Sequence, residues 1–426
     1  MNILLRGGRI IDPSQDLDAP MDILIEGDRI ARVEEQIKPA ADMQVFDLDG
    51  MVVSPGLIDM HIHLREPGFE YKETVRTGSE AAVAGGFTAV ACMANTEPVN
   101  DSRSVTEFIL QQAKLADRAH VYPVAAVSRG LEGKTLAEFG ELKDAGAVAL
   151  SDDGNPVEDS GLMRHALEYA YSLGIPVMSH CEDRGLAAGG VMNEGLVSTL
   201  IGLQGIPSIA EDIMTTRDIA IAEYTKTAIH ISHVSTAGSV QAVRDAKQRG
   251  INVTAETAPH YFALTDEALT GYSTDFKMYP PLRTGSDMTA IRAGLADGTI
   301  DAIASDHAPH SSIEKYVEFD YAANGIIGLE TSLGVSLMLV HEGILSLGDL
   351  IAKMSTNPAS ILKIPKGTLK VGATADITVI DTHKTWTVDR ERFRSKGRNC
   401  PFHGWQLTGK AVLTIVDGTV KYSEIQ

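Results

Sequence analysis

The chain has 426 residues, of which 44% are hydrophobic, and a formal net charge of −20 from 57 acidic and 37 basic residues. A (β/α)8 barrel takes about 250 residues, so this length predicts one barrel with a smaller second domain. So acidic a chain lacks the basic surface that nucleic acid or an anionic membrane would bind, and neither is expected as a partner.

The N-terminal residues are predicted to form short β-strands. Residues 3–11 form one strand, and residues 22–33 form a hairpin with Glu26-Gly27-Asp28 at its turn. Glycine tolerates the positive φ that such a turn requires. Residues 45–48 form a further short strand before a turn at Asp49-Gly50.

The middle of the chain, residues 55–365, alternates short apolar runs with amphipathic segments. The eight runs cover residues 57–63, 87–94, 120–127, 147–152, 175–180, 228–233, 251–257 and 300–306. Alternating strands and helices indicate parallel strands with right-handed crossovers, and eight such units predict a closed TIM-like (β/α)8 barrel. An open doubly wound sheet is the alternative, but the Gly-rich phosphate turn expected after its first strand is absent.

The C-terminal residues return to short strands. Residues 375–381 and 410–422 alternate apolar and polar side chains, with a turn at Asp417-Gly418. Neither end of the chain could bury a core by itself. Residues 1–54 and 366–426 are therefore expected to pair into one small β-sandwich domain beside the barrel.

The cysteines and the apolar runs bear on the compartment. Cys92, Cys181 and Cys400 are widely spaced and form no CxxC pair, so neither a disulfide framework nor a cysteine zinc site is predicted. The N-terminal residues lack the apolar core of a signal peptide, and no apolar run reaches the roughly 18 residues of a membrane span. A cytoplasmic protein is expected.

Imidazole and carboxylate side chains stand at the ends of five apolar runs. These ends are His61-Ile-His63, Ser151-Asp-Asp153, Ser179-His180, Ser232-His233 and Ser305-Asp-His307. In a barrel they share the C-terminal face, where the active site lies. Side chains two apart on a strand point the same way, so His61 and His63 can bind one ion, with Asp59 placed to orient a ligand. Because buried charges need a counterion, this convergence predicts a divalent metal site.

Several motifs resemble those of the dihydroorotases, a family of the cyclic amidohydrolase superfamily. Residues 55–68, PGLIDMHIHLREPG, resemble its first signature, and Ser305-Asp-His-Ala-Pro-His310 resembles its second. The resemblance extends over the whole chain and includes Pro280-Pro-Leu-Arg283, Ala323-Asn-Gly325 and Gly328-Leu-Glu330. It is strongest to the bacterial type I dihydroorotases.

The resemblance implies a site for two zinc ions, with manganese and cobalt as open alternatives. The implied ligands are His61, His63, Asp153, His180, His233 and Asp306. Asp153 would bridge the two ions, and Asp306 would also be the catalytic acid and base. Preferring Asp153 to Asp152 rests on the resemblance alone. Hydantoinases and many relatives use a carboxylated lysine as the bridge, whereas residues 149–154 contain no lysine.

The resemblance also implies the substrate contacts, which are His63, Arg65, Asn95, Tyr279, His310, Asn324 and Gly325. Arg65 and Asn95 would bind the substrate carboxylate, for which a guanidinium fork is suited. His310 and the Asn324-Gly325 backbone would contact the ring. Tyr279 departs from the family, which has asparagine there, so the substrate fit stays open. Residues 311–323 are either a mobile lid or a surface loop.

The activity implied is the reversible hydrolysis of (S)-dihydroorotate to N-carbamoyl-L-aspartate in de novo pyrimidine (UMP) biosynthesis. One alternative is another cyclic amidase, an allantoinase or hydantoinase, against which Arg65 and the missing lysine count. The other is a non-catalytic homologue that acts as a scaffold for aspartate transcarbamoylase, against which the complete ligand set counts. A small-molecule substrate and a homodimer are expected. Association with aspartate transcarbamoylase is left open.

Overall fold

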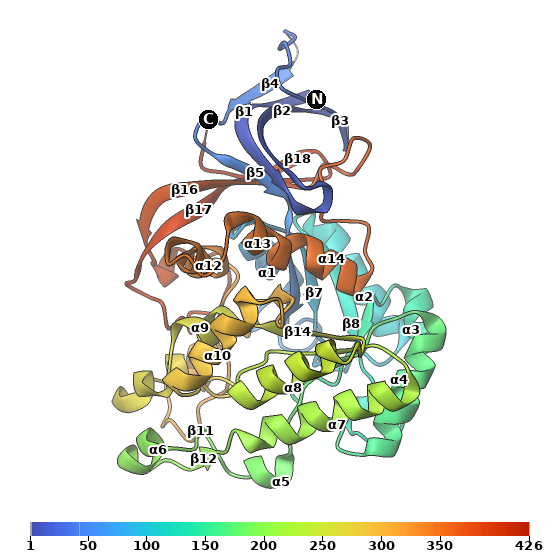
Figure 1. The fold of residues 1–426 in the computed structure, drawn as a ribbon, viewed down its shortest axis with the longest axis vertical. Helices are drawn as coiled ribbons and strands as arrows, with labels where there is room; N and C mark the ends of the chain where they lie inside the picture. Colours follow the sequence, from blue (N-terminus) through green and yellow to red (C-terminus); the bar gives the residue numbers. More distant parts are fainter. Residues whose placement is uncertain (1, 42, 426) are drawn as a thin grey trace.

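The computed structural model describes residues 2–41 and 43–425. Strands from both ends of the chain form one eight-stranded sheet (Figure 1). Its strands are β1 (Asn2–Asp12), β2 (Leu17–Glu26), β3 (Arg29–Glu34), β4 (Met43–Asp47), β5 (Val52–Pro55), β16 (Ile377–Thr387), β17 (Gln406–Val416) and β18 (Thr419–Ser423). Strand β5 pairs antiparallel with β16, with Val53 opposite Val379, so this pairing joins the two ends of the chain.

The terminal sheet folds over on itself. Its hydrogen-bonded order is β18-β17-β16-β5-β1-β2-β3, with β4 added beside β1. Alternate residues from distant strands, among them Ile10, Ile23, Ile377 and Leu413, belong to one buried core. The predicted separate β-domain from the two chain ends is confirmed. The boundaries 1–54, 55–365 and 366–426 stay a prediction.

The middle of the chain forms the predicted barrel. Its strands are β6 (Leu57–Ile62), β7 (Phe87–Cys92), β8 (His120–Ala125), β9 (Ala149–Leu150), β10 (Met178–Ser179), β13 (Ile229–Ile231), β14 (Val253–Thr257) and β15 (Ala302–Ile303). They make two parallel four-stranded sheets, β6-β7-β8-β9 and β10-β13-β14-β15. Parallel bridges from Leu150 to Val177 and from Ile62 to His307 connect the two sheets on both sides. Each strand falls within one of the eight apolar runs predicted from the sequence.

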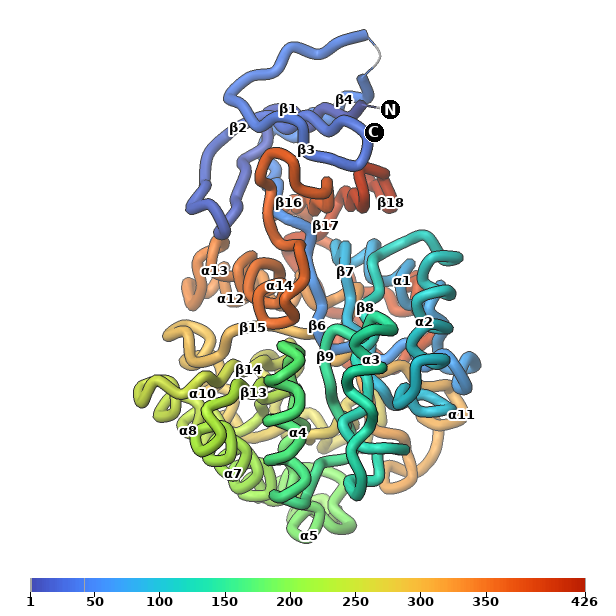
Figure 2. Tube along the Cα trace, turned by 90° about the vertical axis from the view of Figure 1, so that its right-hand side faces the viewer, coloured from blue at the N-terminus to red at the C-terminus, as the bar shows by residue number. Residues whose placement is uncertain are grey.

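Helices surround this barrel (Figure 2). The longer ones are α1 (Val75–Ala84), α2 (Arg103–Ala116), α3 (Phe139–Ala145), α4 (Ser160–Leu173), α7 (Ile209–Thr225), α8 (Ala237–Gln248), α10 (Gly285–Ala296) and α12 (Ser332–His341). Their starts follow local chemistry: Thr74 and Thr77 form a capping box at α1, and Asp159 caps α4. Helix α4 places Met163, Ala166, Leu167 and Ala170 in the core, at the spacing of one helix face.

Shorter elements complete the chain. The short helices are α5 (Arg184–Ala187), α6 (Leu196–Ile201), α9 (Pro259–Ala263), α11 (Ser312–Lys315), α13 (Leu347–Ile351) and α14 (Asn357–Leu362). A π-helical turn, η5 (Ala352–Thr356), connects α13 to α14. The 3-10 turns are η1 (Pro13–Gln15), η2 (Arg129–Leu131), η3 (Asp266–Gly271), η4 (Thr274–Phe276) and η6 (Arg390–Arg392), and β11 (Met192–Asn193) pairs with β12 (Gly205–Ile206).

One end of the barrel is closed by packing. Met60, Ala91 and Met178 from three barrel strands share a buried cluster with Ala359 and Leu362 of α14. Because α14 fills the end nearer to the terminal sheet (Figure 1), a site in the barrel has to open at the other end, where the strands finish.

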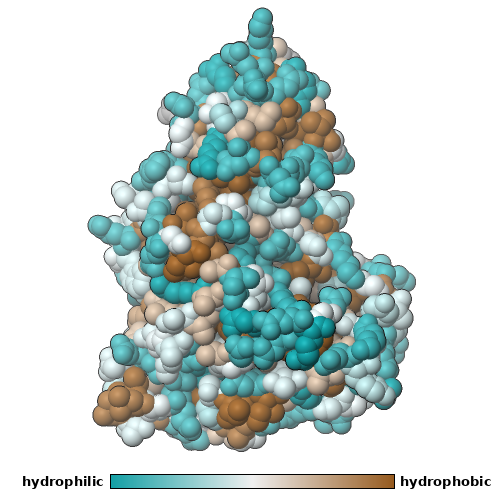
Figure 3. Space-filling model, viewed as in Figure 1, coloured by the Kyte–Doolittle hydropathy of each residue, from teal (hydrophilic) through white to brown (hydrophobic). Residues whose placement is uncertain are grey.

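The surface is largely polar, with separate apolar patches (Figure 3). Exposed apolar side chains include Leu196 and Leu200 of α6, and Ile209 and Ile213 of α7. The brown patches over α6 and the start of α7 lie at the end of the molecule opposite the terminal sheet. Among the described residues, no helix combines the length and apolar character needed to cross a membrane.

Candidate metal centre and active site

The six predicted metal ligands converge at the C-terminal ends of the barrel strands. His61 lies in β6, while the others follow strands β6, β9, β10, β13 and β15, and are His63, Asp153, His180, His233 and Asp306. Each of the six residues is at most 5% exposed. The prediction that the strand ends bring these residues together agrees with the structure.

Short distances join these six side chains. Nε2 of His61 lies 3.3 Å from Oδ1 of Asp153, and Nε2 of His63 lies 3.2 Å from Oδ1 of Asp306. Nε2 of His233 lies 3.3 Å from Oδ1 of Asp153 and 2.7 Å from Nδ1 of His180. Two groups, His61/His63/Asp306 and His61/Asp153/His233, each bring three ligand atoms close enough for one ion.

The charges and hydrogen bonds of the cluster fit a bound cation. Within the described residues, Asp153 and Asp306 form ion pairs only with histidines, never with lysine or arginine. Nε2 of His61 and Nε2 of His180 are buried and have no hydrogen-bond partner there. Buried carboxylates without a lysine or arginine partner, together with imidazole nitrogens without a hydrogen bond, are the donor set that zinc and similar divalent ions bind.

The two carboxylates of the cluster are held ionised. Burial by itself raises the pKa of Asp153, but the imidazoles of His61, His180 and His233 outweigh burial and hold that pKa well below its usual range. For Asp306, the imidazoles of His61 and His63 likewise outweigh burial and lower the pKa. Both groups are therefore carboxylates near neutral pH.

The adjacent residues Asp152 and Asp153 face different surroundings. Asp152 accepts hydrogen bonds from the backbone N–H groups of Val127 and Ser128, at 2.8 and 2.9 Å, and from the Ser128 hydroxyl. These contacts fix the loop after β8. The structure thus places Asp153, and not Asp152, in the cluster.

Glu256 on β14 contacts the cluster, although no motif or spacing in the sequence singles it out. Its Oε1 lies 2.6 Å from Nδ1 of His61, and its Oε2 lies 3.5 Å from Nε2 of His230. By occupying Nδ1, the carboxylate leaves Nε2 of His61 free for an ion. Its position within an apolar run is nevertheless informative, because a largely buried strand holds a glutamate only where the charge has a partner.

Asp59 has a different contact from the one expected. Its carboxylate accepts hydrogen bonds from the backbone N–H groups of Ser305, at 3.1 Å, and His61, at 3.2 Å. It therefore holds the main chain of β6 and of the loop after β15. The imidazole of a ligand is oriented by Glu256 instead.

A cavity of about 300 Å³ opens beside the cluster. It is lined by His63, Arg65, Asn95, Asp153, Gly154, His180, Met278, Tyr279, Asp306, Ala308, His310 and Asn324. All the predicted substrate residues except Gly325 are among them. Gly325 lies directly behind, where an added Cβ would come 2.5 Å from the Ala308 carbonyl oxygen and 2.7 Å from the His310 ring, so no larger residue fits.

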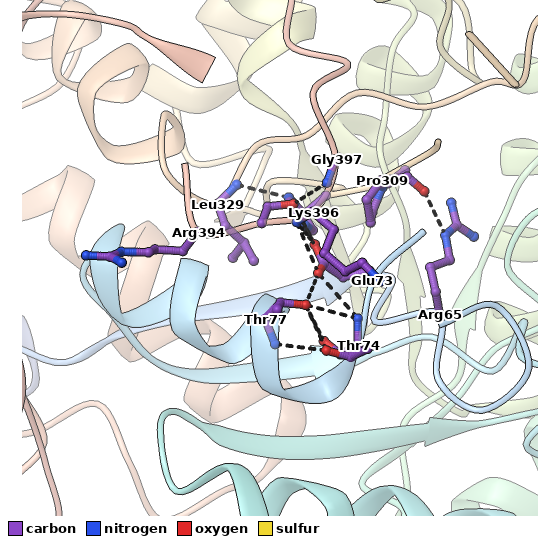
Figure 4. Close-up of polar contacts among 12 residues, drawn as sticks. Arg65, Glu73, Thr74, Thr77, Pro309, Leu329, Arg394, Lys396 and Gly397 are labelled. Carbon is purple, nitrogen blue, oxygen red and sulfur yellow. Dashed lines mark hydrogen bonds and ion pairs between the residues drawn. The ribbon is translucent and has the colours of Figure 1, made fainter. Parts of the chain in front are cut away.

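Arg65 is oriented in this cavity by backbone contacts. It has a left-handed φ of 63°, and its Nε donates to the carbonyl of Pro309 at 3.2 Å (Figure 4). In the described parts of the chain Arg65 forms no ion pair with an acidic residue, and its Nη2 lies 3.3 Å from Nε2 of His310. Its terminal N–H groups are therefore available to an anion.

Asn95 and His310 are held by the groups around them. Oδ1 of Asn95 lies 2.9 Å from Nδ1 of His63, which leaves the Asn95 amide NH2 free to donate. Nε2 of His310 donates to the Asn324 carbonyl at 2.8 Å. Burial, together with nearby Arg65 and Lys72, lowers the pKa of His310 to about 2, so this ring is neutral.

Comparison with known proteins identifies the family of the chain. Residues 50–239 match the family model "Dihydro-orotase-like", and residues 205–422 match "Amidohydrolase family". The chain is 60% identical to a dihydroorotase of Syntrophus aciditrophicus (strain SB) over 100% of both chains. It is 56% identical to a dihydroorotase of Geobacter metallireducens, over 99% of this chain and 100% of that one.

The chain belongs to the dihydroorotase family of the amidohydrolase superfamily. Its fold is similar to that of the L-hydantoinase (dihydropyrimidinase) from Arthrobacter aurescens, with a TM-score of 0.89 and 26% identity over 100% of this chain and 96% of that one. A D-hydantoinase from Thermus sp. gives a TM-score of 0.81 at 25% identity, over 100% of this chain and 96% of that one. The predicted fold and family are confirmed.

Tyr279, the departure from the dihydroorotase pattern, lines the cavity with its ring. The ring stacks on the imidazole of His180, with centroids 5.6 Å apart and planes 21° apart. Its hydroxyl donates to the carboxylate of Glu182. The hydroxyl is therefore already bonded to protein, and the ring is what Tyr279 presents to a ligand.

A mobile lid formed by residues 311–323 remains a prediction. In the structure, charged side chains connect this segment to its neighbours. Nζ of Lys72 lies 2.7 Å from the carboxylate of Glu314. Nζ of Lys315 donates to the carbonyls of Ala323 and Gly325, at 2.8 and 3.1 Å. These contacts connect α11 to both sides of the cavity.

A third group of ligand-type residues, His120, Asp376 and Asp417, lies far from the barrel mouth, at the terminal sheet. In this group the ammonium of a lysine side chain supplies the positive charge. Nζ of Lys366 lies 2.5 Å from Asp376 and 2.9 Å from Nε2 of His120. This group is an ion-pair network around the buried carboxylate of Asp376, with Asp417 exposed at its edge.

Proposed function

We propose that the chain catalyses the reversible hydrolysis of (S)-dihydroorotate to N-carbamoyl-L-aspartate, a step of de novo pyrimidine (UMP) biosynthesis. The observation that carries this proposal is one cavity that joins the His/Asp cluster to the guanidinium of Arg65. A substrate that has a carboxylate beside a cyclic amide would satisfy both groups at once. The full-length similarity to proteins named dihydroorotase supports the same substrate.

For the metal we propose zinc, with two ions per subunit. The first ion would be held by His61, His63 and Asp306, and the second by His180 and His233, with Asp153 between them. Bound zinc supplies Lewis acidity, which lowers the pKa of water and polarises an amide carbonyl. Glu256 would keep Nε2 of His61 directed at the first ion.

Asp306 is proposed as the group that moves the proton. In the hydrolytic direction, a water oxygen adds to the ring amide carbonyl carbon, and the bond from this carbon to the ring nitrogen breaks. The proton that water loses passes to the Asp306 carboxylate and from there to the leaving nitrogen. The products balance: water supplies one oxygen of the new carboxylate, and the released nitrogen ends as the NH2 of a ureido group.

The remaining cavity residues are proposed to position the substrate. The Arg65 fork and the free amide NH2 of Asn95 would bind the substrate carboxylate. His310 and the backbone of Asn324 and Gly325 would border the ring. Fixing both ends of the substrate converts binding energy into orientation of the amide carbonyl at the cluster.

We further propose that the protein is cytoplasmic and forms a homodimer, while association with aspartate transcarbamoylase stays an open alternative. The three widely spaced cysteines, which form no CxxC pair, support the first point, and the prevalence of symmetric dimers among soluble enzymes supports the second. Light scattering after gel filtration, alone and with aspartate transcarbamoylase, would test both assemblies.

The decisive experiment compares substrates. Zinc-loaded protein is assayed with dihydroorotate, hydantoin and allantoin, and only dihydroorotate is expected to be turned over. Asp306→Asn should lower kcat by about 10²–10⁴-fold, the usual contribution of a positioned acid and base. Faster turnover of hydantoin or allantoin would refute the substrate assignment. No turnover of any of the three would instead support the scaffold alternative.

A further inference from the structure

A segment of the C-terminal part of the chain reaches the barrel mouth. Residues 394–399, here called the strap, lie between β16 and β17 of the terminal sheet. The Arg394 and Ser395 N–H groups donate to the carboxylate of Glu330, at 2.8 and 3.2 Å, and Nζ of Lys396 donates to the Glu70 carbonyl at 2.5 Å. Figure 4 shows Lys396 and Gly397 of the strap beside Glu73 and the start of α1.

The strap and α1 meet at the buried carboxylate of Glu73. Oε2 of Glu73 accepts from the Ser395 hydroxyl at 2.5 Å and lies 3.4 Å from Nε2 of His307. Oε1 accepts from the Thr77 hydroxyl and, at 3.3 Å, from the Lys396 N–H. All these partners are donors. Although burial by itself raises the pKa of Glu73, His307 and the hydroxyls outweigh it and lower the pKa.

His307, which contacts Glu73, directly follows Asp306, the proposed acid and base. Its Nδ1 accepts from the backbone N–H groups of Gly328 and Leu329, at 3.1 and 3.4 Å, so its Nε2 is the donor to Glu73. The residue before it, Asp306, has a left-handed φ of 47°, which a non-glycine residue adopts only when its surroundings impose it. The His307 ring is held at both nitrogens, so the backbone directly after Asp306 is restrained.

The other end of the strap holds the cavity wall. Nδ2 of Asn399 donates to the carbonyls of Ala308 and Gly325, at 2.9 Å each, and its Oδ1 accepts from the His310 N–H at 3.2 Å. One buried amide thus joins the two loops that are proposed to border the substrate ring. These contacts are separate from those of Ser395, four residues earlier.

We propose that the strap belongs to the positioning machinery of the active site. Ser395 acts through Glu73 and His307 to hold the Asp306 carboxylate, and Asn399 holds the loops that carry His310 and Gly325. This inference rests on the roles proposed above for Asp306 and His310. The competing explanation is that the strap only fastens the terminal sheet to the barrel. In that case its removal would lower stability without any specific kinetic effect.

The test is a kinetic split between two neighbouring positions of the full-length, zinc-loaded enzyme. Ser395→Ala should lower kcat about 10-fold and leave KM within about twofold, because Asp306 acts in the chemical step. Asn399→Ala should raise KM about 10-fold and change kcat less. Zinc affinity, measured by chelator competition, should fall about 10-fold in Ser395→Ala and stay unchanged in Asn399→Ala.

Asp22→Asn is the matched control. Asp22 is a buried carboxylate of the terminal sheet that accepts from the Gly7 and Ile37 N–H groups at 2.8 Å each, far from the barrel mouth. It should lower the melting temperature and leave kcat, KM and zinc affinity unchanged. If Ser395→Ala does not fold, Glu73→Gln replaces it with the same expected result.

Lower melting temperatures with kcat, KM and zinc affinity all within about twofold of the parent would overturn the proposal. A parent enzyme that does not turn over dihydroorotate would refute the proposed function instead. The zinc affinities of Ser395→Ala and of the control would then still decide whether the strap positions the metal ligand Asp306.

Discussion

Glu256 offers the sharpest test of how the metal centre is built. Its carboxylate is fully buried and lies 2.6 Å from Nδ1 of His61. Glu256→Gln keeps the size and the hydrogen-bond acceptor but removes the negative charge. We expect the variant to fold and to bind zinc more weakly, because the imidazole of His61 becomes a poorer donor to the ion.

The magnitude follows from the contact. A hydrogen bond to a charged group contributes about 1.5–3 kcal/mol, against about 1 kcal/mol for a neutral one, so the substitution loses about 0.5–2 kcal/mol. Loss of a residue that orients a ligand typically weakens metal binding about 10–100-fold, which at 1.36 kcal/mol per tenfold is about 1.4–2.7 kcal/mol. The two free-energy ranges overlap at about 1.4–2 kcal/mol, which corresponds to a loss of zinc affinity of about 10–30-fold.

The assay is competition for zinc with a chelator of known affinity, followed by kcat at saturating zinc. Thr254→Val is the matched control, since Thr254 lies on the same strand and contacts His230 at 2.8 Å. It should bind zinc like the parent. A zinc affinity of Glu256→Gln within about twofold of the parent would show that the contact with His61 does not tune the ligand.

Other predictions address the cavity, the metal and the terminal sheet. Arg65→Lys keeps the charge but loses the fork, so KM for dihydroorotate should rise about 10–100-fold with a smaller change in kcat. Tyr279→Phe should keep KM within about threefold, because the hydroxyl it loses is bonded to Glu182, whereas Tyr279→Ala removes the wall and should raise KM. Chelator treatment should abolish turnover, and added zinc should restore it. Asp376→Asn removes the nearest charged partner of Lys366 and leaves only the exposed Asp417, at 4.0 Å, so urea unfolding at pH 7 should show a loss toward the lower end of about 3–5 kcal/mol. The pKa of Asp376 is lowered, since His120 and Lys366 outweigh burial, so the carboxylate stabilises the fold above its ordinary value of 3.8. The loss should therefore stay constant from pH 7 down to about 4 and shrink below it. A loss that is the same at every pH, or activity that survives the chelator, would contradict these two expectations.

Local patterns in the sequence were sufficient for the barrel strands and for the side chains that stand at their ends. A buried parallel strand is an apolar run, and the residue at its end must face the barrel mouth, so His180 and His233 could be placed without coordinates. Alternation could not choose between Asp152 and Asp153. That choice depends on Val127 and Ser128, whose N–H groups lie on the loop after another strand and bind Asp152.

The residues that the sequence did not reveal act over long separations. Glu256 contacts a ligand 195 positions away, and Ser395 contacts a carboxylate 322 positions away. Neither contact leaves a periodic or local signal, because each partner is set by how the barrel closes and by where the strap returns. The position of a ligand can therefore be read from its own strand, while what orients the ligand depends on the complete fold.

Backbone conformation shows the same dependence on distant contacts. Arg65, His233 and Asp306 all have left-handed φ values, of 63°, 36° and 47°, at the ends of strands that lead into the site. None is glycine, so each conformation opposes the local preference and costs on the order of 1–3 kcal/mol. Buried carboxylates stabilise two of these loops: Glu211 accepts from the Ser235 N–H at 2.9 Å after His233, and Glu73 lies beside the residue after Asp306. Both loops present a side chain proposed as a metal ligand, and each is restrained by an acid that no ligand pattern would identify. Substituting such an acid should therefore impair the metal centre before it unfolds the barrel.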